Sequence, residues 1–192
     1  MLVQQICQVP DEVFDPAFEE VKNIPWQVIN DHRSNNPVFA TSTSVHLRVH
    51  KPPPGVIPKT VDEWSSIVEC RDNPYTLPRF PAVYSLAKWM YNQVNGIALG
   101  RIMIVNLEPG GHVAPHIDPR DYFEMYNRYH VPFKTNSQVL FSGGPNTEQE
   151  HMPLKVLSRL NNRLMHQLDN FSDENRIHLI VDIALEEGNQ IF

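Results

Sequence analysis

Residues 109–119 read PGGHVAPHIDP, which places a histidine two residues before an aspartate just after a glycine turn. In extended backbone the side chains of residues i and i+2 point to the same side, so His116 and Asp118 can converge on one point. Such a pair and one distant histidine form the 2-His-1-carboxylate pattern, which leaves coordination positions open on ferrous iron. The stretch therefore predicts two of the three ligands of a metal ion.

The pair needs support from its surroundings, because a chain with nine histidines and 22 acidic residues is expected to contain one by chance. It follows an apolar segment, residues 102–107, and a Pro-Gly-Gly turn. Loops of this kind lie at the mouths of barrels, where sites are commonly placed. A solvated loop histidine beside a turn aspartate is the alternative interpretation.

The third ligand must come from another strand, and His166 is the best candidate. It lies near the end of a predicted strand, and Arg176 follows ten residues later at the start of the last strand. In an antiparallel hairpin the two would lie close, with strands about 4.8 Å apart. An arginine there could bind the far carboxylate of a metal-chelating dicarboxylate such as 2-oxoglutarate through a bidentate fork. A rim ion pair for Arg176 and a core hydrogen bond for His166 are the alternatives.

Composition bounds the class of protein. The 192 residues, 41% of them hydrophobic, can bury one substantial core, so 1–192 is predicted to be a single domain. A formal charge of −6 argues against a nucleic-acid partner. Cys7 and Cys70 resemble neither a disulfide framework nor a zinc cluster, and no long apolar run or basic leader is visible. We therefore expect a cytoplasmic protein without a membrane partner.

Residues 1–96 predict a helical and irregular region with one or more leading strands. Helices are predicted from Asp15-Pro16, from a Thr60-x-x-Glu63 capping box and after Pro81. Their apolar positions are Phe14, Phe18, Val21 and Ile24 in the first, Val61, Trp64 and Ile67 in the second, and Val83, Leu86, Ala87, Met90 and Val94 in the third. The alternation of Val45, Leu47 and Val49 with polar residues predicts a strand between the first two.

After Gly96 the apolar period becomes two. Strands are predicted over 97–107, 129–141, 154–168 and 176–185, separated by turn-rich segments. The pattern predicts a mainly β fold with flanking helices. We expect a double-stranded β-helix, the jelly-roll or cupin barrel, in which 97–186 carries the metal site and the N-terminal helical region packs on the barrel.

Three ordered segments carry a family resemblance: the motif at 109–116, Arg128-x-His130, and the pair of motifs at 166–170 and 176–182. Together they resemble the aspartyl/asparaginyl beta-hydroxylase family of Fe(II)- and 2-oxoglutarate-dependent oxygenases, over roughly residues 97–185. The resemblance implies that His116 and His166 bind iron and that Arg176 binds the distal carboxylate of 2-oxoglutarate. It also implies that Arg128 and His130 help to bind this co-substrate, with strand packing as the alternative.

The chain departs from the family pattern at two positions. Asp118 stands where the animal namesakes have glycine, so a full triad is available here. This favours the bacterial-type relatives that hydroxylate free amino acids or peptides. Val105 stands where some members have a serine that assists the co-substrate, so contacts to 2-oxoglutarate are expected to differ.

These patterns predict an oxygenase that uses Fe(II), 2-oxoglutarate and O2 to hydroxylate an amino acid or an Asp/Asn-type residue of a peptide or protein. A carboxylate of the substrate could pair with Arg48 or Arg120. Two other interpretations stay open: a cupin-fold metal enzyme that does not use 2-oxoglutarate, and a non-catalytic binding protein. Arg176 distinguishes the 2-oxoglutarate-dependent oxygenase from these alternatives, because only an enzyme that uses 2-oxoglutarate requires a carboxylate clamp there.

Overall fold

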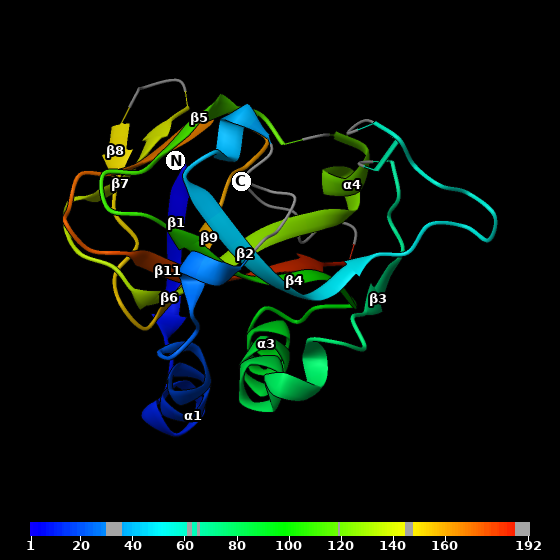
Figure 1. The fold of residues 1–192 in the computed structure, drawn as a ribbon, viewed down its shortest axis with the longest axis horizontal. Coiled ribbons are helices and arrows are strands. Elements are labelled where there is room, and N and C mark those ends of the chain that lie inside the picture. Colours follow the sequence, from blue (N-terminus) through cyan, green and yellow to red (C-terminus); the bar gives the residue numbers. More distant parts are fainter. Residues whose placement is uncertain (30–35, 61–62, 65, 119, 145–147, 187–192) are drawn as a thin grey trace.

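Two antiparallel sheets form the body of the molecule (Figure 1). The computed structural model describes residues 1–29, 36–60, 63–64, 66–118, 120–144 and 148–186, with only the backbone described for residues 120 and 148. The larger sheet has the order β1-β9-β6-β11-β4-β2-β3 and the smaller one β5-β10-β7-β8. The strands are β1 Val3–Gln8, β2 Ser42–His50, β3 Cys70–Asp72, β4 Ala98–Leu107, β5 His112–His116, β6 Tyr126–Lys134, β7 Val139–Gly143, β8 Glu148–Glu150, β9 Val156–Leu160, β10 His166–Asn170 and β11 Arg176–Ala184.

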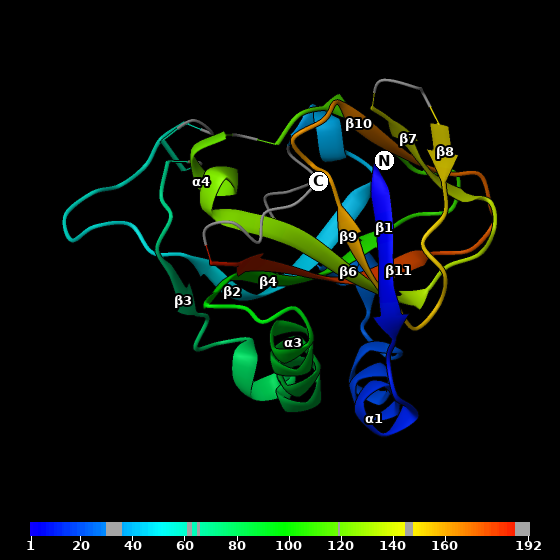
Figure 2. The same ribbon diagram turned by 180° about the vertical axis from the view of Figure 1, so that it is seen from behind.

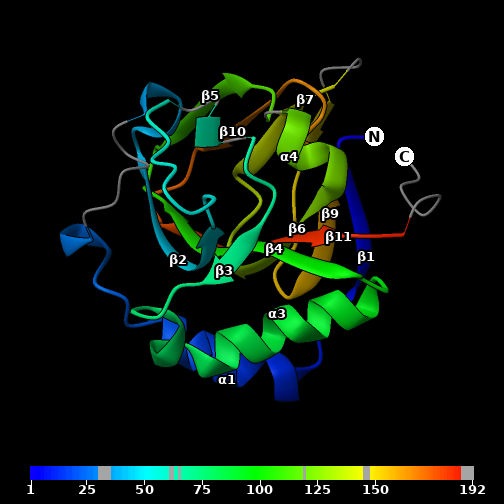
Figure 3. The same ribbon diagram turned by 90° about the vertical axis from the view of Figure 1, so that its right-hand side faces the viewer.

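Helices cover one outer face of the larger sheet. These are α1 (Asp11–Val21) and α3 (Pro81–Gln93), which lie side by side beneath it, whereas the smaller sheet lies on its other side (Figure 3). The remaining helical segments are α4 (Arg120–Met125) and three short 3-10 turns, Trp26–Val28, Pro37–Phe39 and Leu77–Arg79. The predicted double-stranded β-helix with flanking helices is therefore confirmed.

Apolar side chains fill both spaces between these layers. The predicted stripe of α3 packs against alternate residues of β4 and β11, and the buried set includes Val83, Leu86, Ala87, Met90, Ile102, Ile104, Leu179 and Val181. A second cluster, which includes Leu107, Val113, Phe141 and Leu168, lies between the two sheets. Burial of both faces explains the nearly continuous apolar run of β11.

The N-terminal region supplies strands to the larger sheet as well as helices. β1 pairs with β9 along one edge, and β2 pairs with β4 (Figure 2). The first helix begins at Asp11, one turn before the predicted Asp15-Pro16 start, so Pro16 lies inside it. Asp11 and Glu12 account for the earlier start, because acidic side chains in a first turn interact favourably with the helix dipole.

The capping box at Thr60 is present as a reciprocal pair of hydrogen bonds. The backbone N–H of Thr60 donates to Glu63 Oε2, and that of Glu63 donates to Thr60 Oγ1, both at 3.2 Å. Of the apolar positions predicted for this segment, Ile67 is buried and Val61 lies outside the described residues. Burial of Trp64 was predicted wrongly: its side chain is 41% exposed, because it lines an open groove.

Two predicted strands prove to be two strands each. The segment 129–141 contains β6 and β7, joined by a turn in which Asn136 Oδ1 accepts a hydrogen bond from the Gln138 N–H. The segment 154–168 contains β9 and β10, separated by a turn at residues 161–165. In both cases the chain passes from the larger to the smaller sheet at the turn, so one continuous strand is impossible.

Candidate metal and co-substrate site

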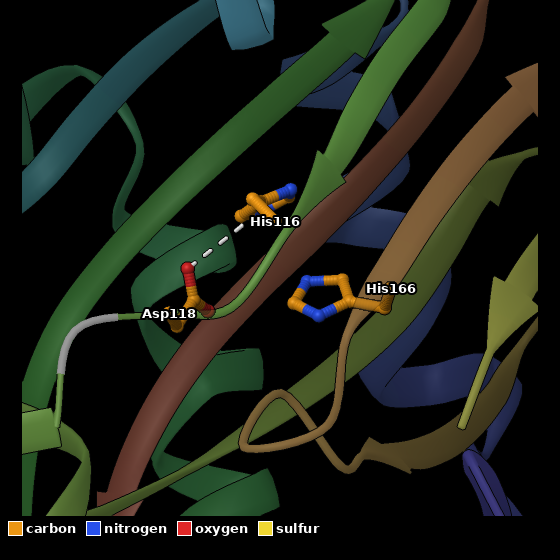
Figure 4. Close-up of side chains that lie close together, drawn as sticks. All are labelled: His116, Asp118 and His166. Carbon is orange, nitrogen blue, oxygen red and sulfur yellow. Dashed lines mark ion pairs between the residues drawn. The ribbon is translucent and has the colours of Figure 1, made fainter. Parts of the chain in front are cut away.

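The predicted histidines and aspartate meet where β5 lies beside β10. His116 is the last residue of β5 and is the cross-strand partner of His166, the first residue of β10. Asp118 follows β5 by two residues, and its Oδ1 lies 3.7 Å from His116 Nε2 (Figure 4). One potential ligand atom from each of the three residues lies within 4.8 Å of the others. The convergence expected of residues i and i+2 is therefore observed.

Backbone hydrogen bonds orient both imidazoles. His116 Nδ1 lies 2.8 Å from the carbonyl oxygen of Ala114, and His166 Nδ1 lies 2.9 Å from that of Leu164. A carbonyl can only accept, so each Nδ1 carries the proton and each Nε2 keeps its lone pair. In metal-binding histidines the ring nitrogen that does not bind the metal usually donates such a hydrogen bond. Burial also lowers the pKa of His166, which keeps that ring neutral and able to bind a cation.

The carboxylate of Asp118 presents one oxygen to the histidines and the other to the protein. Oδ2 accepts hydrogen bonds from Arg128 Nη1 at 2.7 Å and from Asn162 Nδ2 at 2.8 Å. Burial opposes ionisation of this carboxyl, but the guanidinium, His166 and the Asn162 amide outweigh it and lower its pKa to about 2. Asp118 is thus ionised at neutral pH, with Oδ1 turned toward His116. Two imidazole nitrogens and one carboxylate oxygen are a donor set that fits ferrous iron.

A chain of ion pairs extends from Asp118 into the larger sheet. Arg128 Nε and Nη2 donate to the two oxygens of Asp182, at 2.9 and 3.2 Å. Asp182 also accepts from Arg101 Nε at 3.1 Å and is fully buried. Arg128, expected at the co-substrate, therefore spans two carboxylates and orients one member of the triad. Asp182, within the 176–182 motif, and Arg101 had no predicted role, because their pairing depends on contact between β4, β6 and β11.

The second part of the site surrounds Arg176, which is 2% exposed at the start of β11. Its Nη2 lies 2.6 Å from Nδ1 of His178 and 3.5 Å from Nδ1 of His130. The guanidinium also stands over the ring of Phe141, 5.6 Å from its centre. Since the guanidinium can only donate, His178 Nδ1 is the acceptor of this hydrogen bond. His178 lies in the 176–182 motif but had no predicted role, although its position two residues after Arg176 in a strand puts both on one face.

One small cavity joins these two groups. Its polar lining residues include His116, His166 and Arg128 of the first group and His130 and Arg176 of the second. The walls are mainly apolar and include Val105, Leu107, Val113, Phe141, Leu168 and Ile180. The expected proximity of Arg176 to His166 is therefore observed, but the predicted hairpin is wrong. β10 and β11 belong to different sheets, and the two side chains line the same cavity.

The two arginines expected to contact a substrate have different outcomes. Arg48 donates to the carbonyl oxygens of Gly100, Cys70 and Leu99 and forms an ion pair with Asp72. These contacts fasten β2 to its neighbours, and the substrate role of Arg48 stays a prediction. The side chain of Arg120 lies outside the described residues.

Comparisons with known proteins agree with this geometry. The family model described as aspartyl/asparaginyl beta-hydroxylase matches residues 64–185. AviO1 from Streptomyces viridochromogenes Tue57 superposes with a TM-score of 0.56 at 10% identity, covering 97% of this chain and 90% of that one. A search of curated proteins returned no match.

Two further solved structures have the same fold. A prolyl-4-hydroxylase from Pseudomonas putida has a TM-score of 0.52 at 11% identity, with 95% and 90% of the two chains covered. A 2OG-Fe(II) oxygenase family oxidoreductase from Burkholderia pseudomallei has a TM-score of 0.53 at 8% identity, with 74% of this chain and 67% of that one covered.

Among the described helices, none is long and apolar enough to cross a membrane.

Proposed function

Because the chain belongs to the aspartyl/asparaginyl beta-hydroxylase family, we propose that it is an Fe(II)- and 2-oxoglutarate-dependent oxygenase. Its substrate would be an amino acid or an Asp/Asn-type residue of a peptide or protein, hydroxylated at a C–H bond. The observation that carries the proposal is the clustering of His116, Asp118 and His166, together with the cavity that the two histidines share with Arg176.

In this proposal His116 Nε2, His166 Nε2 and Asp118 Oδ1 hold the iron, which with 2-oxoglutarate and dioxygen supplies the oxidising chemistry. The two histidines are already in the tautomer that a metal requires, since each Nδ1–H is bonded to a carbonyl. Arg128 and Asn162 hold Asp118 by its other oxygen. The triad is thus oriented by hydrogen bonds outside it, which limits reorganisation when a metal binds.

Arg176 would bind the distal carboxylate of 2-oxoglutarate through a charge-assisted fork. His178 and Phe141 fix the position of its guanidinium. The apolar walls of the cavity exclude water from the bound co-substrate and strengthen its interaction with the arginine. A metal enzyme that does not use 2-oxoglutarate would have no need for this buried cation facing the triad.

The test is the visible charge-transfer absorption that forms when 2-oxoglutarate chelates iron. Anaerobic addition of Fe(II) and then 2-oxoglutarate to the wild-type protein is expected to produce the band. Asp118→Ala and Arg176→Met are expected to weaken it at fixed co-substrate concentration. His112→Ala is the matched control, because His112 is half-exposed and its Nδ1 contacts Asp169.

Two results would count against the proposal. Absence of the band in folded wild-type protein would remove the 2-oxoglutarate function. A band of full intensity in both variants would show that other residues hold the metal and the co-substrate. If the band forms, release of succinate in the presence of candidate amino acids and peptides would identify the substrate.

A further inference from the structure

A large groove lies beside the cavity that His116 and His166 line. Its volume is about 1270 Å³, which exceeds the roughly 300–1,000 Å³ of pockets that bind small molecules. Phe39 lines both the groove and the cavity, and its ring stands edge-on to that of His116, with the ring centres 5.2 Å apart. The groove therefore meets the site at Phe39. It has room for a chain of several residues rather than for one amino acid.

The charged side chains that line the groove are mostly basic. Arg71, Arg79 and Arg101 line it, and Glu20 is the one carboxylate among the described lining residues. Both oxygens of Glu20 accept hydrogen bonds from backbone N–H groups at the start of α3, each at 2.9 Å. That carboxylate is thereby neutralised locally by a helix N-terminus. The described lining of the groove is therefore positive, although the whole protein carries a formal charge of −6.

Arg101 lies at the end of the ion-pair chain that begins at Asp118. Its Nε donates to Asp182, and its guanidinium stacks on Tyr122, 4.6 Å from the ring centre. Its side chain is 22% exposed toward the groove. Within the described part of the chain, its two terminal nitrogens have no hydrogen-bond partner. Arg101 is thus held in place through one nitrogen while its other donors are available to a ligand.

We propose that the groove binds an acidic peptide segment, with Arg101 contacting the acidic group nearest to the triad and Arg71 and Arg79 contacting groups farther along. Apolar side chains that line the same groove, which include Ile24, Val28 and Ile29, would contact side chains of the same peptide. The inference rests on the proposed function for what happens to the peptide, but the binding itself does not require iron or 2-oxoglutarate.

Fluorescence anisotropy of two labelled peptides tests this inference. The first is AVEEDEEVA, and the second is its amide counterpart AVQQNQQVA, which has nearly the same shape and no side-chain charge. Wild-type protein is expected to prefer the acidic peptide by about a hundredfold or more, which corresponds to two charge-assisted hydrogen bonds. Arg101→Gln is expected to remove most of the preference and Arg101→Lys to retain part of it.

A second variant keeps the test decisive if Arg101→Gln does not fold. Arg71→Gln/Arg79→Gln changes two exposed residues and is expected to reduce the preference about tenfold as well. Lys134→Gln removes one positive charge outside the groove lining and serves as the control, with the preference unchanged. Equal binding of the two peptides, binding of neither, or an undiminished preference in the arginine variants would overturn the inference.

A single-stranded oligothymidylate is added as a competitor. Displacement of the acidic peptide by a lower concentration of oligothymidylate would also overturn the inference, in favour of a nucleic-acid ligand. The charge-transfer band keeps this failure separate from that of the proposed function. A band without peptide discrimination refutes only the groove inference, and discrimination without a band refutes only the oxygenase function.

Discussion

Replacement of Arg128 by methionine is expected to destabilise the metal-free protein by about 3 kcal/mol, at the lower end of the range for breaking a buried ion pair. The guanidinium donates three hydrogen bonds to Asp118 and Asp182, at 2.7, 2.9 and 3.2 Å. The side chain of Arg128 is 9% exposed, that of Asp118 8% and that of Asp182 0%. Asn162 and Arg101 remain as partners of the two carboxylates, which is why the lower end applies.

Urea unfolding in the presence of a chelator, followed by circular dichroism at pH 7, measures this loss. For a chain of this size the same change corresponds to a fall in Tm of roughly 6–12 °C. Asp118→Asn and the double variant complete a thermodynamic cycle. Since the amide needs no counterion, Arg128→Met is expected to cost at least about 1 kcal/mol less in the protein that already carries Asp118→Asn.

The pH dependence provides a second measurement on the same variants. The folded pKa of Asp118, about 2, lies below its ordinary value of about 3.9, so its stabilisation is fully present above pH 4 and is lost as the pH falls toward 2. Arg128→Met is expected to move this loss to higher pH. A cost below about 1 kcal/mol at pH 7, or additive costs in the cycle, would refute the assignment of Arg128 as the counterion.

Three other substitutions test separate parts of the structure. Burial and Arg176 lower the pKa of His178 well below its ordinary value, so below about pH 6.5 the unfolded chain binds a proton that the folded protein does not, and the unfolding free energy falls as the pH falls. His178→Gln should reduce that fall by up to about 1.4 kcal/mol per pH unit, and an unchanged slope between pH 6.5 and 5 would contradict this. Gly143→Ala should weaken Co(II) binding about tenfold in an absorbance titration. At φ +151° the added Cβ would lie 2.2 Å from the carbonyl oxygen of Met165, so the backbone that positions His166 must shift. An unchanged affinity for Co(II) would contradict this prediction. Arg48→Met should lower the unfolding free energy by about 1–3 kcal/mol without changing the 2-oxoglutarate band, and loss of the band in folded protein would be the contrary result.

Local chain geometry made several features predictable. The apolar stripe of α3 follows from a period of 3.6 residues, and the strand β11 follows from the apolar run after Arg176. The turn that separates β6 from β7 also had a local signal, since Asn136 bonds the backbone two residues on. That signal was not used, and one long strand was predicted in its place.

The role of each arginine was less predictable, because a guanidinium bonds to whatever the fold brings near it. Arg48 meets backbone carbonyls of β4 and β3, whereas Arg101 meets Asp182 from a strand 81 residues away in the chain. The reverse assignment, with Arg48 free for a substrate, was equally compatible with the sequence. Only the register of β2, β4 and β11 decides between them.

The sequence by itself determined that His116 and Asp118 point to one side, because the i, i+2 relation in extended backbone is a property of the chain at that point. It also made His166 and Arg176 the candidates to complete the site. Only the tertiary structure decided that β5 lies beside β10, which sets His116 opposite His166, and that Arg176 faces them from the other sheet. The physical reason is that strand pairing and sheet packing depend on burying apolar faces from distant parts of the chain, and no local pattern specifies which faces meet.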